Sequence, residues 1–265
     1  MYSEVELPGV GTLWRSGTPA DLRGEPQGES RGEPQDGPED RVRRHVVAAD
    51  GCADIILIDG ELAVAGPSTR WLLGRDGREG PVVGLRFAPG LAGAALALDA
   101  ADLRDLAVPA RDALPGPAVD RGIRALRLFA APDDGPRRGA SLAAEYLARG
   151  GEFRRALELD IGEGQVRWAS RLRGAVRTGE TPAGLAASLD LSDRQLRRRM
   201  LQSFGYGFTT LRRLSRAHRA KSLLRDGLAP ALAAHEAGYA DQAHLTREFR
   251  RIAGRTPGQL AGSGA

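Results

Sequence analysis

Cysteine is nearly absent from this chain of 265 residues, because Cys52 is the only one. A single cysteine excludes an intrachain disulfide and gives no sign of an oxidising compartment. Long apolar runs are absent too, and without a run of about 18 apolar residues no transmembrane helix is expected. The first residues, MYSEVE, lack the charged segment and apolar run of a secretory leader. We therefore expect a soluble, cytoplasmic protein with no membrane partner.

Lysine is as rare as cysteine, since Lys221 is the only lysine among 38 basic residues. The other cations are arginines, whose forked guanidinium groups suit phosphate and guanine. A G+C-rich coding sequence would also enrich arginine, so their placement carries the argument. Residues 1–165 have a formal charge of −7 and residues 166–265 one of +11, which together give +4. The basic half is the candidate for binding a polyanion.

Several enzyme motifs are missing as well. The sequence contains no Walker loop, no H-E-x-x-H and no cluster of zinc-ligand residues. Cys52 and His45 alone do not complete a ligand set, so neither a metal nor a cofactor is expected. Two functions stay open for a chain with one basic half. One is an enzyme, for example one of DNA repair, fused to a DNA-binding tail; the other is an architectural DNA binder.

The acidic half predicts an α+β domain over residues 1–150. Its short β-type runs, separated by turn sequences such as Asp59-Gly60, favour a small β barrel or sandwich. These runs are 10–14, 43–49, 53–58, 61–66 and 81–87, and helical spacing follows at 91–98, 103–106 and 121–130. Residues 16–40 are polar, rich in Gly, Pro and Glu, and predicted to form a disordered loop.

The basic half carries only helix signals. After a linker at 151–165, an amphipathic helix is expected from Val166. Thr181 and Pro182 then mark the N-cap and first position of another helix. The sequence therefore predicts an all-α DNA-binding domain over residues 166–265.

Two helix-turn-helix units are expected within this domain. Residues 182–204 turn at Asp190 and Leu191, and residues 230–252 repeat the pattern with a turn at Gly238 and Tyr239. One helix over 208–225 joins the units. At 1.5 Å per residue it is about 27 Å long, enough to hold two recognition helices roughly one DNA turn, about 34 Å, apart.

The second helix of each unit has one apolar face and one polar face. Apolar residues recur at helical spacing and must point inward: Leu196, Met200 and Phe204 in the first unit, and Leu245, Phe249 and Ile252 in the second. The outward faces carry long donors near the helix N-termini, as reading of the major groove requires. One such face is typical of any solvated helix. Its occurrence twice favours DNA recognition.

Residues 166–260 resemble the DNA-binding region of the AraC-type (AraC/XylS) family of transcription regulators. The resemblance is strongest over 237–260, through Gly238, Tyr239, Asp241-Gln242, His244-Leu245, Arg247, Phe249 and Gly254-Arg255-Thr256-Pro257. The first unit matches through Leu185-Ala186, Leu191-Ser192, Leu196 and Arg198. In two places the sequence departs from the family pattern. Asp190 replaces a turn glycine, and Pro230 with Ala233 replaces bulky aliphatic residues, which predicts a late start for that helix.

The resemblance implies base-reading positions at Arg194 and Arg198, and at Gln242, Ala243 and Arg247. With their outward neighbours, the predicted DNA-binding residues are Arg194, Gln195, Arg197, Arg198, Gln242, Ala243, His244, Thr246, Arg247 and Arg250. The N-terminal half is similar to sensor-like domains found ahead of this region in some bacterial regulators. A regulator of this family, an activator for instance, is expected to have as partners double-stranded DNA, RNA polymerase, a small-molecule effector and a second copy of itself.

Overall fold

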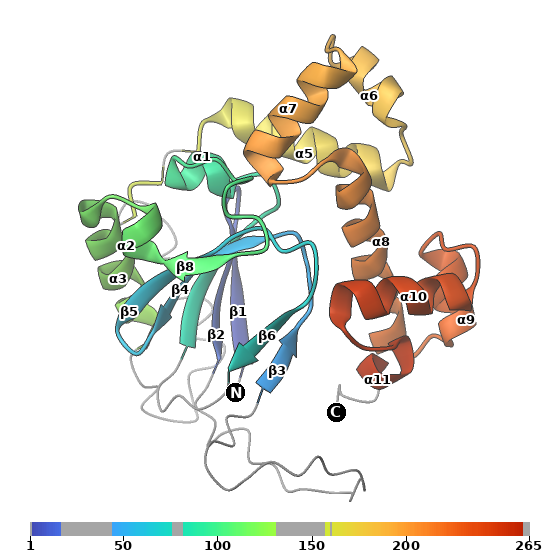
Figure 1. The fold of residues 1–265 in the computed structure, drawn as a ribbon, viewed down its shortest axis with the longest axis horizontal. Coiled ribbons are helices and arrows are strands. Elements are labelled where there is room, and N and C mark those ends of the chain that lie inside the picture. Colours follow the sequence, from blue (N-terminus) through green and yellow to red (C-terminus); the bar gives the residue numbers. More distant parts are fainter. Residues whose placement is uncertain (1, 17–43, 76–81, 131–156, 160, 262–265) are drawn as a thin grey trace, which may run out of the picture.

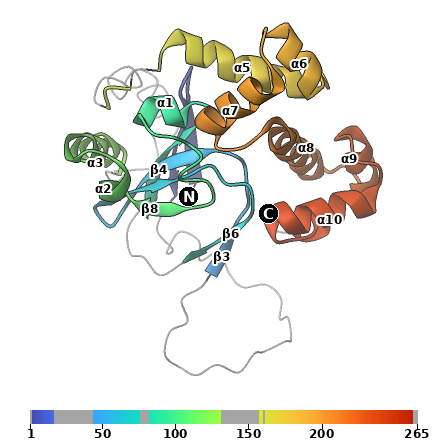
Figure 2. The ribbon, with the colours of Figure 1, turned by 45° about the horizontal axis from the view of Figure 1, so that its top comes forward.

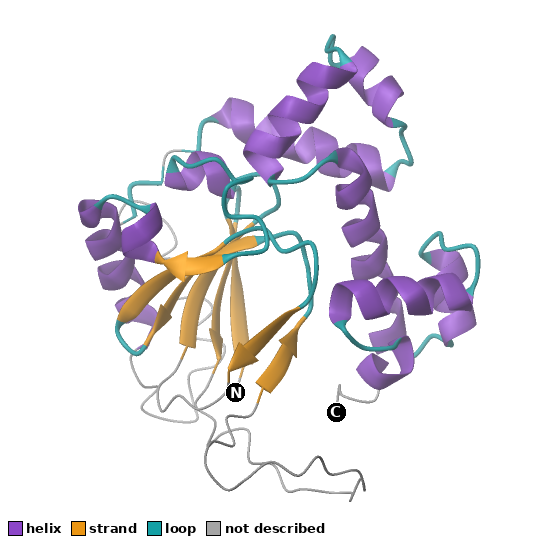
Figure 3. Ribbon diagram, viewed as in Figure 1, coloured by secondary structure: helices purple, strands orange, loops and turns teal. Residues whose placement is uncertain are grey.

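Strands and helices are segregated along the chain (Figure 3). The computed structural model describes residues 2–16, 44–75, 82–130, 157–159 and 161–261. Within these ranges every strand ends by Pro109, and the chain from Glu163 onward is helical apart from turns. The predicted α+β half and all-α half are therefore both confirmed.

A six-stranded antiparallel sheet forms the centre of the N-terminal half (Figure 1). Its order is β1 (Tyr2–Leu7), β2 (Gly11–Ser16), β7 (Val82–Phe87), β4 (Ala53–Ile58), β5 (Glu61–Ala65) and β8 (Ala107–Pro109). A separate two-stranded sheet pairs β3 (Arg44–Val47) with β6 (Leu72–Arg75). The structure thus adds β1, β6 and β8 to the strands that the sequence predicts.

Local sequence explains the hairpin between β4 and β5. Its two turn residues, Asp59 and Gly60, have φ angles of 51° and 84°, the left-handed pair that a tight hairpin requires and that Asp-Gly supplies.

Two other predictions for this half have different outcomes. Residues 103–106, expected to be helical, lie in turns that lead into β8, so this prediction was wrong. The predicted disordered loop at 16–40 lies outside the described residues except for Ser16, which ends β2.

Helices pack against the six-stranded sheet. The longest, α3 (Gly116–Ala130), packs against β4, β5 and β7 and buries Leu126 and Phe129. Gly122 allows this close packing, because a Cβ there would lie 2.6 Å from a methyl carbon of Leu62. Two short helices, α1 (Ala92–Leu96) and α2 (Ala110–Ala113), are the other helices among the described residues of this half.

The C-terminal half is built around one long helix, α8 (Phe208–Arg225). It contacts α5 (Glu163–Arg177) before it, and α9 (Pro230–Glu236), α10 (Gln242–Ala253) and α11 (Pro257–Ala261) after it. The remaining helices are α6 (Pro182–Ser188) and α7 (Asp193–Phe204). Helix α5 begins at Glu163 rather than Val166, inside the predicted linker. Helix α9 begins at Pro230, so the predicted late start was wrong.

The two halves share one apolar core. Buried side chains form a continuous cluster that runs from the sheet through α5 and α7 to α10. In Figure 2 the helices from α5 to α10 follow one another around one side of the sheets. The basic half is therefore packed directly on the acidic half. The predicted domain boundary near residue 150 itself lies outside the described residues.

Candidate nucleic-acid interface

Helices α6 and α7, joined by a tight turn, correspond to the first helix-turn-helix unit that the sequence predicts. Asp190 in the turn has a φ of 54°, the left-handed conformation that aspartate tolerates better than most residues. Ser192 and Gln195 then form the predicted capping box. The Ser192 Oγ accepts the Gln195 N–H at 3.3 Å, and the Gln195 Oε1 accepts the Ser192 N–H at 2.8 Å. These bonds fix where α7 begins.

Helix α7 turns its apolar face inward and its polar face to solvent. The predicted inward residues Leu196, Met200 and Phe204 are all buried. The predicted DNA-binding residues of this unit are all exposed: Arg194, Gln195, Arg197 and Arg198. The structure therefore brings three predicted arginines together on one accessible helix.

Arg199, in the same arginine run, contacts α5. Its guanidinium carbon lies 4.0 Å from the centre of the Trp168 ring, close enough for a cation–π contact. The indole N–H of Trp168 in turn donates to the Ser203 hydroxyl at 3.0 Å. These two contacts hold α7 against α5. The sequence pattern, which placed these arginines by helical spacing alone, did not assign this role to Arg199.

Helices α9 and α10, with the turn between them, correspond to the second predicted unit. Asp241 caps α10, and its carboxylate accepts the His244 N–H at 2.6 Å. Leu245, Phe249 and Ile252 are buried, as predicted. Four predicted DNA-binding residues are exposed on this helix: Gln242, Ala243, Arg247 and Arg250.

His244 and Thr246, also predicted to bind DNA, are only half-exposed. The His244 ring meets the Tyr239 ring edge-on, with centroids 5.2 Å apart. The Thr246 hydroxyl donates to the carbonyl of Gln242 at 2.8 Å. Their contacts within the protein leave each of them less surface for DNA than Arg247 has, and their role stays a prediction.

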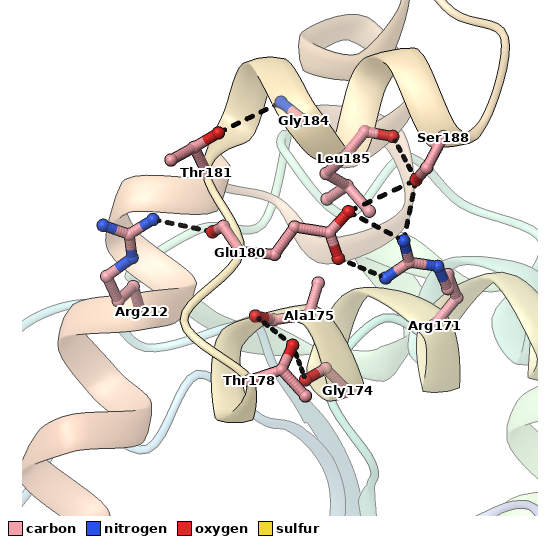
Figure 4. Close-up of polar contacts among 10 residues, drawn as sticks. All are labelled: Arg171, Gly174, Ala175, Thr178, Glu180, Thr181, Gly184, Leu185, Ser188 and Arg212. Atoms are coloured by element: carbon pink, nitrogen blue, oxygen red, sulfur yellow. Dashed lines mark hydrogen bonds and ion pairs between the residues drawn. The ribbon is translucent and has the colours of Figure 1, made fainter.

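A network of polar contacts supports the first unit (Figure 4). Arg171 on α5 donates to both carboxylate oxygens of Glu180, at 2.8 and 2.9 Å, and to the Ser188 hydroxyl of α6 at 2.7 Å. Arg212 of α8 donates to the carbonyl of Glu180 at 3.0 Å. The hydrogen bonds from Arg171 lower the pKa of Glu180 below its usual value. One loop residue thus links α5, α6 and α8.

The second unit is supported from α8 by Arg216. It donates to the carbonyl of Gly238 at 3.1 Å, and its guanidinium carbon lies 5.0 Å from the centre of the Tyr239 ring. Gly238 has a φ of 81°, so a glycine suits this turn. Burial raises the pKa of Tyr239 to about 12, and this residue therefore stays neutral at physiological pH.

A cluster of charged groups lies within the N-terminal half near its contact with the helices. The Asp54 carboxylate accepts from the Trp14 indole at 2.9 Å and from Arg86 at 3.2 Å. Burial raises the pKa of Asp54 to about 6, although Arg86 opposes this shift. Burial likewise raises the pKa of the Cys52 thiol well above its usual value, which disfavours the reactive thiolate.

Neither a metal centre nor a membrane span is present in the part of the chain that the structure describes. No three His, Cys, Asp or Glu side chains gather there in a way that could hold a metal ion. Nor does any described helix combine the length and apolar character needed to cross a bilayer.

A comparison with known protein families identifies the domain that contains these helices. Residues 185–262 match a family model described as a helix-turn-helix domain. They form an AraC-type helix-turn-helix domain. The AraC-type domain begins within α6 and includes α7, α8, α9 and α10. Domains of this type occur in DNA-binding transcription regulators, as the sequence resemblance implied.

Solved structures that resemble the chain include ToxT of Vibrio cholerae. Wild-type ToxT bound to an unsaturated fatty acid is 12% identical, with a TM-score of 0.43, and the match covers 84% of this chain and 87% of ToxT. ToxT bound to (E)-4-(8-methylnaphthalen-1-yl)but-3-enoic acid is 11% identical, with a TM-score of 0.46 and 98% coverage of both chains. No curated protein matches the chain.

Proposed function

We propose that this protein is a sequence-specific transcription regulator that reads two successive major-groove segments, one with α7 and one with α10. One observation carries the proposal: each of two helix-turn-helix units exposes an arginine-bearing helix, and the single helix α8 connects the two units. A non-specific architectural binder needs positive charge but has no need of two spaced reading helices.

Two of the predicted residues are the best candidates for reading bases. Arg198 and Arg247 stand on the exposed faces of α7 and α10, where a guanidinium group can donate to O6 and N7 of guanine. Helix α8 has 18 residues, which at 1.5 Å per residue is about 27 Å and suits readers one DNA turn apart. The charge of +11 over residues 166–265 supplies attraction to phosphate.

The N-terminal half, residues 1–150, acts as the regulatory domain in this proposal. Its direct packing on the basic half, through α5, supports that role. Gln165 donates to the carbonyl of Gly90 at 2.7 Å, and Arg173 donates to that of Pro89 at 2.7 Å. A small-molecule effector or a second copy of the chain would act by favouring one arrangement of these contacts. RNA polymerase would receive the signal in the cytoplasm, and the chain itself is not an enzyme.

Binding to selected DNA tests the proposal. The full-length protein is used to select duplexes from a random library, and its affinity for a selected duplex is compared with that for scrambled duplex at several salt concentrations. We expect the selected duplex to bind about 1,000-fold more tightly or better, with affinity falling steeply as salt rises. Equal affinity for both duplexes would show that the protein only neutralises phosphates.

A further inference from the structure

Two neighbouring turns of the N-terminal half form a ridge that faces the AraC-type domain. We call residues 49–52, before β4, and 67–71, before β6, the ridge. The two turns are joined by backbone bonds from the Gly51 N–H to the Ser68 carbonyl at 3.0 Å and from the Ser68 N–H to the Cys52 carbonyl at 3.3 Å. The Asp50 carboxylate also accepts the Cys52 N–H at 2.9 Å.

Aspartates on both sides make the ridge rigid. Asp105 accepts the Thr69 N–H at 2.6 Å and the Thr69 hydroxyl at 2.8 Å, and its own N–H donates to the carbonyl of Pro67 at 3.1 Å. Asp50 forms an ion pair with Arg86 of β7 at 3.2 Å. Both turns are therefore fixed to the body of the N-terminal half.

The ridge contacts the first reading unit directly after α7. The Tyr206 hydroxyl donates to the carbonyl of Gly51 at 3.0 Å, and Tyr206 is only 2% exposed. Gly205, the left-handed residue that ends α7, lies against the ridge as well. A Cβ at Gly205 would be 3.0 Å from a ring carbon of Pro67.

The ridge contacts the second reading unit at the equivalent place. The Ala49 N–H donates to the carbonyl of Ile252, near the end of α10, at 2.9 Å. Gly254, the left-handed residue that ends α10, packs on the Trp71 ring, because a Cβ there would lie 3.0 Å from it. Between these two contacts, Arg213 of α8 donates to the carbonyl of Thr69 at 3.3 Å.

These contacts give the two reading units a second connection besides α8. A single helix sets the distance between two units, but the turns at its ends allow each unit to rotate. Contacts with one rigid body after α7, along α8 and after α10 restrain those rotations. We infer that the ridge positions α7 and α10 relative to each other, with Tyr206 and Trp71 as its positioning residues. The inference rests on the proposed function in one respect: the positioning matters because both helices read one DNA duplex.

Hydrogen exchange of the Ala49 amide tests the inference without DNA. This amide reports the contact with the second unit, whereas Tyr206 belongs to the first. In the full-length protein, Tyr206→Phe removes only the hydroxyl bonded to the ridge. We expect it to speed exchange at Ala49 by about threefold or more, since loosening one contact of a shared rigid element loosens the other. Tyr239→Phe, which removes a buried hydroxyl that makes no hydrogen bond within the described residues, is the matched control and leaves the Ala49 rate unchanged.

Spacing of the DNA segments supplies the second measurement. Wild-type protein and Trp71→Ala are compared on a selected duplex and on the same duplex with two base pairs inserted between the segments. We expect the insertion to weaken wild-type binding at least about threefold more than it weakens binding by the variant. Unchanged Ala49 exchange in Tyr206→Phe overturns the inference whatever the DNA results. An equal insertion penalty for both proteins overturns it as well. Failure to select any duplex contradicts the proposed function and leaves the exchange test valid.

Discussion

The two proposed helix-turn-helix units, α6 with α7 and α9 with α10, are each a pair of helices joined by a turn, but they differ in how firmly they are supported. In the first, α6 buries Leu185 and is held by the Arg171–Glu180 pair, and α7 starts in a full capping box. In the second, α9 buries only the small side chains of Ala233 and Ala234 and leaves Leu232 60% exposed. The first unit is therefore supported by more contacts of its own helices than the second, although both lie in the same domain.

The reading faces differ in the same direction. The first exposes Arg194, Arg197 and Arg198 over little more than one helical turn, whereas the start of the second exposes Gln242 and Ala243. Arginines supply both phosphate attraction and guanine contacts, and the second helix exposes its arginines, Arg247 and Arg250, only beyond this start. Under the proposed function, this difference predicts that the first unit contributes more of the affinity and the second more of the discrimination.

Truncating the supporting helices gives the largest expected contrast. Leu185→Ala removes a fully buried side chain and lowers the free energy of unfolding by about 2–5 kcal/mol. Ala233→Gly, in the second unit, lowers it by about 1 kcal/mol through helix propensity. Chemical denaturation of the full-length variants measures both losses. Similar losses would mean that the two units are equally well supported.

Arginine replacement tests the contrast between the reading faces. Arg198→Ala and Arg247→Ala should each cost about 1–3 kcal/mol at a selected duplex and relax base preference in separate segments. By the comparison above, the loss is larger for Arg198. Arg225→Ala is the control, because this exposed arginine ends α8 outside both reading helices. If all three variants lose equal affinity for selected and scrambled DNA, these arginines contact only phosphates.

The helix caps offer a smaller and more local test. Ser192→Ala and Asp241→Ala each remove a side chain that caps a reading helix, at a cost of about 0.5–2 kcal/mol of stability. Ser192 also belongs to a reciprocal capping box, so its variant should additionally increase exchange at the amides of the first turn of α7. Equal fraying of α7 and α10 would remove this difference between the units.

Acidic pH is expected to loosen the first unit slightly. The folded-state pKa of Glu180 is lowered, so its stabilising contribution is present above its unfolded value of about 4.5 and is lost as the pH falls through the folded value. Hydrogen exchange across the connection between α5 and α6 should therefore increase below about pH 4.5 in the wild type. Glu180→Gln should show no such pH step. A step of the same size in the variant would assign the change to another group.

Sequence patterns predicted the local parts of this fold well. The caps at Thr181, Ser192 and Asp241, and the buried spacing of Leu196 and Phe249, follow from bonds and periodicities within a few residues, and the structure confirms them. The family resemblance located the AraC-type domain, with which the helix-turn-helix match at 185–262 agrees.

Long-range contacts were beyond such patterns. The bonds from Tyr206 to Gly51 and from Ala49 to Ile252 join residues far apart in the sequence, and no periodicity predicts them. Residues 103–106 looked helical because their leucines are spaced three apart. Hydrogen bonds between Asp105 and the ridge hold them in turns instead. The half-buried state of His244 also depends on a neighbour, the Tyr239 ring.

Footprinting on a selected duplex tests the central claim most directly. With full-length protein, the account predicts two protected major-groove segments on one face of the DNA, with centres about one helical turn, or roughly 10 base pairs, apart. Arg198→Ala should weaken protection of one segment and Arg247→Ala that of the other. A single protected segment that both variants weaken alike would contradict the claim that α7 and α10 each read their own part of the site.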